Sequence, residues 1–561
     1  MDKVRIVALG GLDEMYKTCV VIEINDDIFV VDCGMKFPDI TKPGIDYVIA
    51  RTDYLVENKD RVKGYFISYG HDSCFGGIPH IVKNVPAPVY CTDIAKAFLG
   101  MFCKHNHLDY SHIDFHIVEP TDKIVIAGHE IEFFSTCSNV AKSMGVCFHT
   151  DQGNVIYLSN NVFDNNNDKD FNFDVSKAAE ISAKNRTLVL LQDSLYADNV
   201  GYTNPRYRTL PAIQRTLRDA PGRVLVAIDS PDIYNIIAVI NEAMRLGRKI
   251  VVYDNSTKDV IDVLIKTKCL NLDEKAFLPM DEVNRYRAQN VLILLVAFPK
   301  SLFYKLSLLA AHLNDEQILK LQATDTVIIA SYAGSEVEIA KTNALNELYK
   351  NDCKIFSLDA KTSLKMHSSV EDIKMALSIF KPRYYIPIMG ALTKLFANAK
   401  IAVGMNIGLN HNNVFVLDNG IQLEFDNFLA KVLPNRIITG NIYVDGKGVG
   451  DIEKNVLLER QKFSDDGVLI LAATISKSKR DIVLGPDIQS RGLVFVKESD
   501  SLMKEITKIF LLNIRQELAK ENYSISYMEM TIKEQVFKAI RRSILKSPTI
   551  IPIIDVSTKP L

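Results

Sequence analysis

The sequence predicts an α/β protein with three parts: two packed β-sheets flanked by helices, an inserted doubly wound domain, and a small α+β domain at the C-terminus. Three observations lead to this fold class. The first 200 residues alternate short β-branched runs with Gly- and Asp-bearing turns and hold few helices. From about residue 206, strands and helices alternate regularly. After about residue 450, strands return with two helices between them.

The expected core strands are short apolar runs that end in turn residues. They are VRIVALGG, CVVIEI, DIFVVDCG, VKGYFISYG, PVYCT, KIVIAGHEIEFF, GVCFHT, NVIYLS and TLVLLQDS. Helices are expected near Ile78–Asn84 and at Thr92–Cys103. Many strands before few helices favour two packed sheets over a simple Rossmann alternation.

The inserted domain begins with the buried strand RVLVAIDS and a helix that ends at Gly247. Further strands KIVVYDN, NVLILLVAF and TDTVIIASY alternate with helices, which is typical of a doubly wound sheet. The unit SSVEDIKMALSIFKPRYYIPIMG then returns to the earlier style. In the C-terminal part we expect strands DGVLILAATI, GLVFVKES and PTIIPIIDV.

Composition narrows the class of protein. A chain of 561 residues is too long for one core, and 47% hydrophobic with 24% charged residues is ordinary for a soluble protein. We see no signal peptide and no membrane span, and nine cysteines without a CxxC pair indicate reduced thiols in a cytoplasmic protein. The net charge of -2 means that any RNA-binding surface is a local patch.

Motifs along the whole chain resemble those of ribonuclease J. They are ALGGLDE, FVVDCGMKFPD, GIDYVI, VKGYFIS, GGIP, DSLYADNVGYT, GNIYVDGKGVGD and SRGLVFVKES, in family order and spacing. The resemblance implies a metallo-β-lactamase αββα sandwich at 1–205 and 360–450. It also implies an inserted β-CASP domain at 206–359 and a C-terminal α+β domain at 455–561.

Ribonuclease J proteins use two zinc ions to activate water for attack on RNA, and the first ligand motif of that family is HxHxDH. The corresponding loop here reads Tyr69-Gly70-His71-Asp72-Ser73-Cys74, so only the second histidine is present. A tyrosine is a poor zinc ligand because its phenol has a pKa of about 10. His71 is therefore a vestigial catalytic residue.

The other family ligand positions are also changed, and an amide at the bridging position carries no charge. The seven degenerate metal-ligand positions are Tyr69, His71, Ser73, Cys74, Ser138, Asn160 and Met389. We expect no cofactor, and well under one zinc per chain in the purified protein, because six of the seven ligand positions are changed. Zinc is expected only if the site has been rebuilt.

Substrate-contacting motifs differ from the family pattern too. The β-CASP signature is LVAFPKS at 295–301, without the glycine that lets a backbone approach phosphate. His367 falls on the histidine of the family's SGHAS motif, which lies near the scissile phosphate. By resemblance, His367, Ser368 and Ser369 are substrate-binding candidates, and His367 is a second vestigial catalytic residue.

Three other groups of residues could bind metal or RNA, and each also has a purely structural interpretation. An improvised zinc site from His71, Asp72, Cys74 and Cys137 competes with buried free thiols and a loop histidine. The His105–Asp109 segment mimics HxHxD, but its position indicates solvated surface. A basic stripe of an amphipathic helix could contact RNA or be a solvated face; it comprises Lys533, Lys538, Arg541, Arg542 and Lys546.

The leading functional hypothesis is a non-catalytic ribonuclease J paralogue in RNA processing or decay, which binds RNA and acts as partner or regulator of an active ribonuclease J. Its partners would be RNA and that paralogue or a second copy of itself, with no membrane. The alternatives are an active 5′-exo/endoribonuclease with a weaker, rebuilt site, and a structural protein without RNA contact. We expect the C-terminal domain to mediate oligomerisation, because few helices cover its apolar strands.

Overall fold

A computed structural model describes residues 1–39, 42–164, 168–203, 209–313, 319–331, 337–358, 366–450, 454–493 and 500–557. The chain divides into two compact units. Unit 1 comprises Met1–Lys36 and Val48–Ile442, and unit 2 comprises Phe37–Tyr47 and Tyr443–Leu561.

Two mixed sheets form the centre of unit 1. The first sheet, in spatial order, consists of β22 (Leu429–Val432), β21 (Gln422–Asp426), β1 (Val4–Gly10), β2 (Cys19–Ile24), β3 (Asp27–Val31), β6 (Val62–Phe66), β7 (Val89–Cys91) and β8 (Phe115–Ile117). The second sheet consists of β20 (Tyr384–Ile388), β13 (Thr187–Asp193), β12 (Asn154–Leu158), β11 (Met144–Phe148), β10 (His129–Ser135) and β9 (Lys123–Ile126). Two short strands, β4 (Met35–Lys36) and β5 (Tyr47–Ala50), pair antiparallel.

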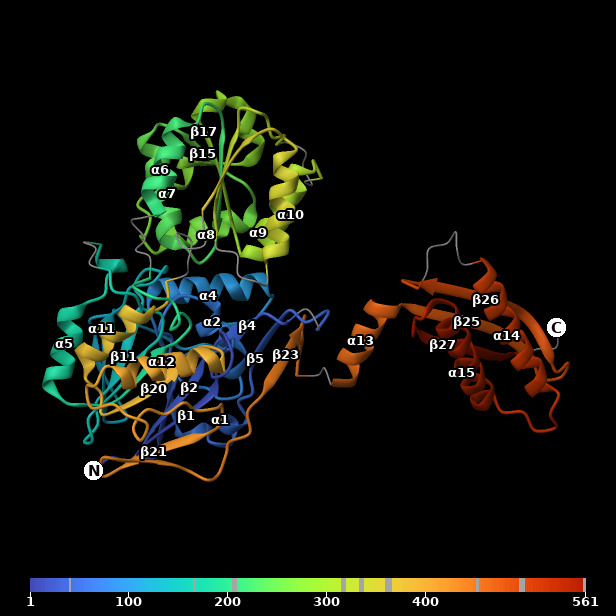
Figure 1. Ribbon diagram of the computed structural model, residues 1–561, viewed down its shortest axis with the longest axis horizontal. Helices are drawn as coiled ribbons and strands as arrows, with labels where there is room; N and C mark the ends of the chain where they lie inside the picture. Colours follow the sequence, from blue (N-terminus) through green and yellow to red (C-terminus); the bar gives the residue numbers. More distant parts are fainter. Residues whose placement is uncertain are drawn as a thin grey trace. The chain divides into compact units, whose positions relative to one another are not determined.

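The two sheets pack face to face. Alternate residues of each strand point to opposite faces, so each sheet contributes one apolar face to the core between them. In β1, Val4 and Ile6 enter the core between the sheets, whereas Val7 and Leu9 enter the core that also holds residues of α4. On the outer face of the second sheet, Tyr385 packs in a core shared with α5, α11 and α12. The layers are therefore helix, sheet, sheet and helix (Figure 1), which confirms the predicted sandwich.

The helices around these sheets begin at side-chain caps where the sequence provides them. The Thr92 hydroxyl accepts from the Ala95 N–H at the start of α4, and the Asp174 carboxylate caps α5 through the Lys177 N–H. The helices are α1 (Asp53–Glu57), α2 (Asp72–Phe75), α3 (Ile78–Ile81), α4 (Asp93–His105), α5 (Val175–Lys184), α11 (Val370–Phe380) and α12 (Leu392–Gly404).

A parallel sheet between β13 and α11 in the sequence forms the inserted part of unit 1. Its strands, in spatial order, are β16 (Phe277–Leu278), β15 (Lys249–Val252), β17 (Val291–Ala297), β14 (Val224–Asp229), β18 (Thr326–Ala330) and β19 (Lys354–Ser357). Its helices are α6 (Thr209–Asp219), α7 (Ile233–Arg245), α8 (Asn255–Lys266), α9 (Pro299–Ala310) and α10 (Glu338–Tyr349). Helices α6, α7 and α8 share one core with the strands and α9 and α10 share the other, so both faces are covered (Figure 1).

The predicted junctions of the inserted domain, at 205/206 and 359/360, lie outside the described residues. The proposed division into 206–359 and the flanking segments therefore stays a prediction at its boundaries.

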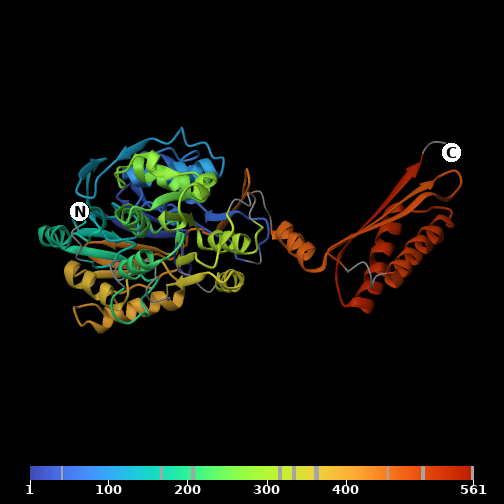
Figure 2. The ribbon, with the colours of Figure 1, turned by 90° about the horizontal axis from the view of Figure 1, so that it is seen from above.

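Unit 2 has a three-stranded sheet in the order β26 (Asp481–Arg491), β25 (Val468–Ser476) and β27 (Thr549–Ser557). Helices α14 (Asp500–Leu518) and α15 (Ile525–Ile544) cover one face (Figure 2, red). The unit also holds α13 (Lys454–Asp466), and β23 (Asn441–Asp445) pairs with β24 (Gly448–Val449) through residues 444–449.

One strand of unit 2 differs from the sequence-based expectation. The partner of β25 is β26, which precedes GLVFVKES; Gly492 and Leu493 of that motif are not in a strand and 494–499 lie outside the described residues. Apolar residues in β26 are sparse, and a hairpin register with β25 rather than apolar density decides the pairing. No helix in the described part of the chain is both long and apolar enough to cross a membrane.

Candidate functional site

The loop that corresponds to the first ligand motif joins β6 to α2, and its side chains bond to one another. The Tyr69 hydroxyl lies 3.2 Å from Ser73 Oγ, and Ser73 Oγ lies 2.8 Å from His71 Nδ1. His71 is also the N-cap of α2, where Nδ1 accepts from the Ser73 N–H at 3.1 Å. The Nδ1 atom of the one retained histidine is thus occupied within the loop.

Tyr69 and Cys74 are buried in forms that do not bind metal. Burial raises the pKa of the Tyr69 phenol well above its ordinary value. Burial, followed by the nearby Asp32 carboxylate, raises the pKa of the Cys74 thiol well above its ordinary value. Both groups therefore keep their protons at neutral pH, and a thiol binds zinc as the thiolate.

Asp32, at the end of β3, is the hub beneath this loop. Its Oδ1 accepts from the Ser68 N–H at 2.8 Å, and its Oδ2 accepts from Ser68 Oγ at 2.9 Å and from the Tyr157 hydroxyl at 2.7 Å. Burial raises the pKa of Asp32 to about 6 despite these donors. No ligand motif singles out Asp32 in the sequence, although it lies within the DCG motif.

The three remaining ligand positions follow other strands: Ser138 comes after β10, Asn160 after β12 and Met389 after β20. Ser138 accepts from the Val140 N–H at 3.1 Å and contacts Ser143 Oγ at 2.5 Å. Met389 packs in the core between the sheets with a left-handed φ of 58°. Such a φ is uncommon in a non-glycine residue.

Two buried acceptors at this site lack partners. Asp72 Oδ2 and Asn160 Oδ1 form no hydrogen bond to any residue that the structure describes. An unpaired buried acceptor costs about 1–3 kcal/mol. No hydrogen-bond donor among the described residues reaches these two oxygens.

The residues present do not fit the dinuclear zinc site of the family. Two zinc ions need several imidazole or thiolate donors and a bridging anion. Asn160 carries no charge, and Tyr69 and Cys74 are protonated. Among the described residues, no set of three His, Cys, Asp or Glu donors within 4.8 Å of one another includes a family ligand position.

His367, which precedes α11, forms a buried pair with a residue that the sequence analysis missed. Its Nδ1 lies 2.6 Å from Asp193 Oδ2, and its ring meets Tyr196 edge-on at 5.5 Å. His367 is 2% exposed and Asp193 is fully buried. The pair joins the end of β13 to the start of α11, and no sequence signal placed these residues together.

Ser368 and Ser369 are buried as well, and their hydroxyls serve the fold. Ser368 Oγ donates to the Asn161 backbone carbonyl at 2.7 Å. Ser369 caps α11 and contacts Thr203 Oγ1 at 2.8 Å. Their assignment to substrate binding stays a prediction.

The rival candidates have structural partners. His105 Nε2 lies 2.6 Å from Asp259 of α8, while 41% of the His105 side chain remains exposed. Cys137 is buried. In the basic stripe, Lys538 pairs with Glu534 and Arg542 pairs with Glu505.

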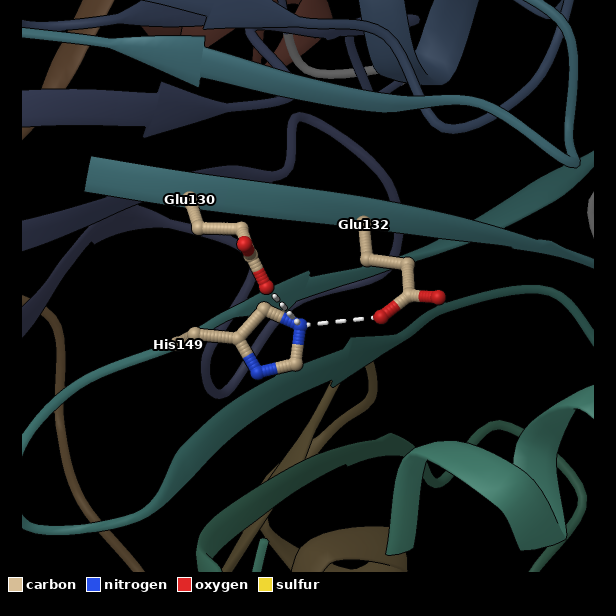
Figure 3. Close-up of side chains that lie close together, drawn as sticks. All are labelled: Glu130, Glu132 and His149. Atoms are coloured by element: carbon tan, nitrogen blue, oxygen red, sulfur yellow. Dashed lines mark hydrogen bonds and ion pairs between the residues drawn. The ribbon is translucent and has the colours of Figure 1, made fainter. Parts of the chain in front are cut away.

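Another cluster of potential ligands, Glu130, Glu132 and His149, was not expected from the sequence (Figure 3). Glu130 and Glu132 lie on β10, and His149 directly follows the adjacent strand β11. The alternation Glu-Ile-Glu in one strand and Cys-Phe-His in the next is the signal that places them on one face.

The comparisons with known proteins agree with the fold. The Ribonuclease J β-CASP domain profile matches residues 221–348, and the Ribonuclease J C-terminal domain profile matches residues 455–555. Ribonuclease J 2 of Staphylococcus aureus (strain NCTC 8325 / PS 47) is 29% identical over 552 residues, which cover 98% of each chain. Ribonuclease J 2 of Staphylococcus epidermidis is 28% identical over the same share of both chains.

A solved structure shares the fold. The crystal structure of a protein of unknown function from Enterococcus faecalis V583 superposes with a TM-score of 0.53 at 13% identity, covering 77% of this chain and 100% of that chain. This likeness concerns the fold alone. The two domain profiles and the full-length relatives together confirm the resemblance seen in the motifs: the chain belongs to the ribonuclease J family.

Proposed function

We propose that this chain is a non-catalytic ribonuclease J that binds RNA and acts as partner or regulator of an active ribonuclease J. One observation carries the proposal: six of the seven family ligand positions hold residues unsuited to the metals, and the first-motif side chains hydrogen-bond to one another. A site that needs two cations to lower the pKa of water cannot be built from a protonated phenol, a serine and an amide.

The preserved scaffold supports a role in RNA metabolism. The chain aligns with Ribonuclease J 2 over 98% of both lengths, so the sandwich, the inserted parallel sheet and the C-terminal unit are all present. The left-handed backbone at Met389 and the unpaired acceptor of Asn160 support a cleft that keeps its form after losing its ligands. A protein that retains the scaffold but not the chemistry is suited to binding.

The test is an RNA degradation assay with the full-length protein, alone and mixed with an active ribonuclease J from the same source. We expect no metal-dependent turnover by the chain alone, measurable RNA binding, and a changed rate of degradation in the mixture. His71→Ala is the matched control, because a vestigial residue contributes nothing to turnover.

Turnover by the chain alone that requires added zinc or manganese and disappears in His71→Ala would overturn the proposal. That result would favour the alternative, an active 5′-exo/endoribonuclease with a rebuilt site. Absence of RNA binding together with an unchanged paralogue would favour a purely structural role.

A further inference from the structure

Four potential metal ligands of three chemical kinds face one another across β10 and β11. Glu130 and Glu132 are two residues apart in β10, and Cys147 and His149 are two residues apart at the end of β11. Glu132 pairs with Cys147 in the antiparallel register, and the His149 N–H donates to the Glu130 carbonyl at 3.0 Å. Directly opposed side chains are about 5 Å apart at Cβ, so all four converge on one face.

One ligand atom each from Glu130, Glu132 and His149 lies within 4.8 Å of the others, and Cys147 adds a contact to His149 alone. His149 Nε2 is 3.0 Å from Glu132 Oε2, 3.6 Å from Glu130 Oε1 and 4.0 Å from Cys147 Sγ (Figure 3 shows the first two contacts). Ligands at 2.0–2.3 Å from a tetrahedral zinc are roughly 3.3–3.8 Å apart. Small side-chain adjustments are therefore enough to close the site.

The orientation of the His149 ring is fixed from outside the cluster. Asn154 Nδ2 donates to the carbonyls of Ile181 and Asn185 at 3.0 and 3.1 Å, so its Oδ1 faces His149 and accepts from Nδ1 at 2.8 Å. Nδ1 therefore carries a proton, and Nε2 faces two carboxylates. Either a proton or a metal ion on Nε2 would satisfy both carboxylates, and the Nδ1 contact matches the way metal-binding histidines are held.

Two lysines neutralise the carboxylates: Lys177 binds the Glu132 oxygen that faces away from His149, whereas Lys123 binds the Glu130 oxygen that faces His149. Lys177 Nζ lies 2.5 Å from Glu132 Oε1, and Lys123 Nζ lies 2.6 Å from Glu130 Oε1. Glu132 Oε2 remains directed at His149. Lys123 is 47% exposed and can move into solvent when an ion binds.

The ionisation of the carboxylate suits this role. Burial alone raises the pKa of Glu132, but hydrogen bonds from Lys177 and His149 outweigh it and hold the pKa below its ordinary value. The thiol differs: burial and the two carboxylates raise the pKa of Cys147 well above its ordinary value. Cys147 can thus become a ligand only when the ion itself displaces the thiol proton.

We infer that Glu130, Glu132, Cys147 and His149 bind one zinc ion, with a structural role. Imidazole, thiolate and carboxylate donors select zinc over magnesium or calcium, which prefer oxygen ligands alone. Ser138 follows the end of β10 at Ser135, and three residues of strand, about 10 Å at roughly 3.3 Å per residue, separate that end from Glu132. The zinc site is therefore separate from the family's metal positions and independent of the proposed function.

The experiment is calorimetric titration of chelator-treated, full-length protein with zinc chloride, and with magnesium chloride for comparison. We expect one zinc per chain, at least 10-fold weaker binding in Glu132→Gln and His149→Ala, and no response to magnesium. His71→Ala with Cys74→Ser is the matched control and should bind zinc like the unmodified protein. Glu130→Gln, at a half-exposed position that the fold tolerates, should also weaken binding.

Cobalt(II) replaces zinc in a second measurement that reports on the thiol. We expect a near-ultraviolet thiolate-to-cobalt absorption band that Cys147→Ser removes. No zinc binding by the unmodified protein would mean that a proton alone bridges His149 and the carboxylates, which overturns the inference. Zinc binding that survives Glu130→Gln, Glu132→Gln and His149→Ala but is lost in the His71 and Cys74 control would also overturn it.

Discussion

Replacing Asp32 by Asn should change how the stability of unit 1 depends on pH. Burial raises the pKa of Asp32 from 3.8 to about 6, although three donors from Ser68 and Tyr157 point at the carboxylate. Between about pH 4 and pH 6 the folded chain holds a proton that the unfolded chain has released. The free energy of unfolding therefore falls as pH rises through this window and is level above it.

The magnitude follows from the shift. About two pKa units at 1.36 kcal/mol each correspond to about 3 kcal/mol. Asn keeps the shape: its oxygen can accept from the Ser68 N–H and its amide can donate to a hydroxyl. It also tolerates the left-handed φ of 56° at this position. The free energy of unfolding of Asp32→Asn, relative to that of the unmodified protein, should therefore rise by about 3 kcal/mol from pH 4 to pH 7.

Urea denaturation at a series of pH values between 4 and 7.5 measures this difference. Asp26→Asn, at an exposed turn position before β3, is the control and should give a flat difference. The reasoning is refuted if the difference between Asp32→Asn and the unmodified protein stays constant within about 1 kcal/mol across the series.

Three further changes test other parts of the molecule. Arg248→Met should lower the free energy of unfolding by about 3 kcal/mol or more, because the guanidinium donates to four buried carbonyls, of Gly222, Val291, Leu217 and Ala220; a loss under 1 kcal/mol in urea melts would contradict this. His367→Gln should lower the free energy of unfolding by about 3 kcal/mol, because the Asp193 carboxylate is left buried without its partner. A lower melting temperature would show this loss. Ile553→Glu, on the sheet face of unit 2 opposite α14 and α15, should reduce the mass of the full-length protein in solution if this face joins two copies; an unchanged mass speaks against assembly through it.

Elements with a strong local signal were predictable from the sequence. The helix expected at Thr92–Cys103 is α4, Asp93–His105, because a threonine cap and an apolar stripe define it. The parallel strands of the inserted part are apolar throughout, since both faces are covered. β26 was missed because its short apolar run, Ile482–Leu484, is followed by Gly485 and Pro486, and its pairing depends on β25.

The candidate site was predictable in one respect only. Residue identities at the family positions showed that Tyr69 and Asn160 replace ligands, and the resemblance supplied those positions. The contacts of His367 with Asp193 and of Asp32 with Tyr157 join segments more than 100 residues apart, and no local pattern encodes them. The same holds for His149, whose neighbours depend on strand register.

The zinc content of the protein bears both on a rebuilt catalytic centre and on the structural zinc site. The expectation of well under one zinc per chain considered only the degenerate positions, whereas β10 and β11 offer a second donor set. Total zinc content therefore cannot by itself distinguish a rebuilt catalytic centre from a structural ion. Zinc binding that is lost in His71→Ala would belong to the family site, which can activate water. Zinc binding that is lost in His149→Ala would stabilise the β10–β11 pair. A chain with zinc at His149 and no turnover would retain a metal-dependent fold without metal-dependent chemistry.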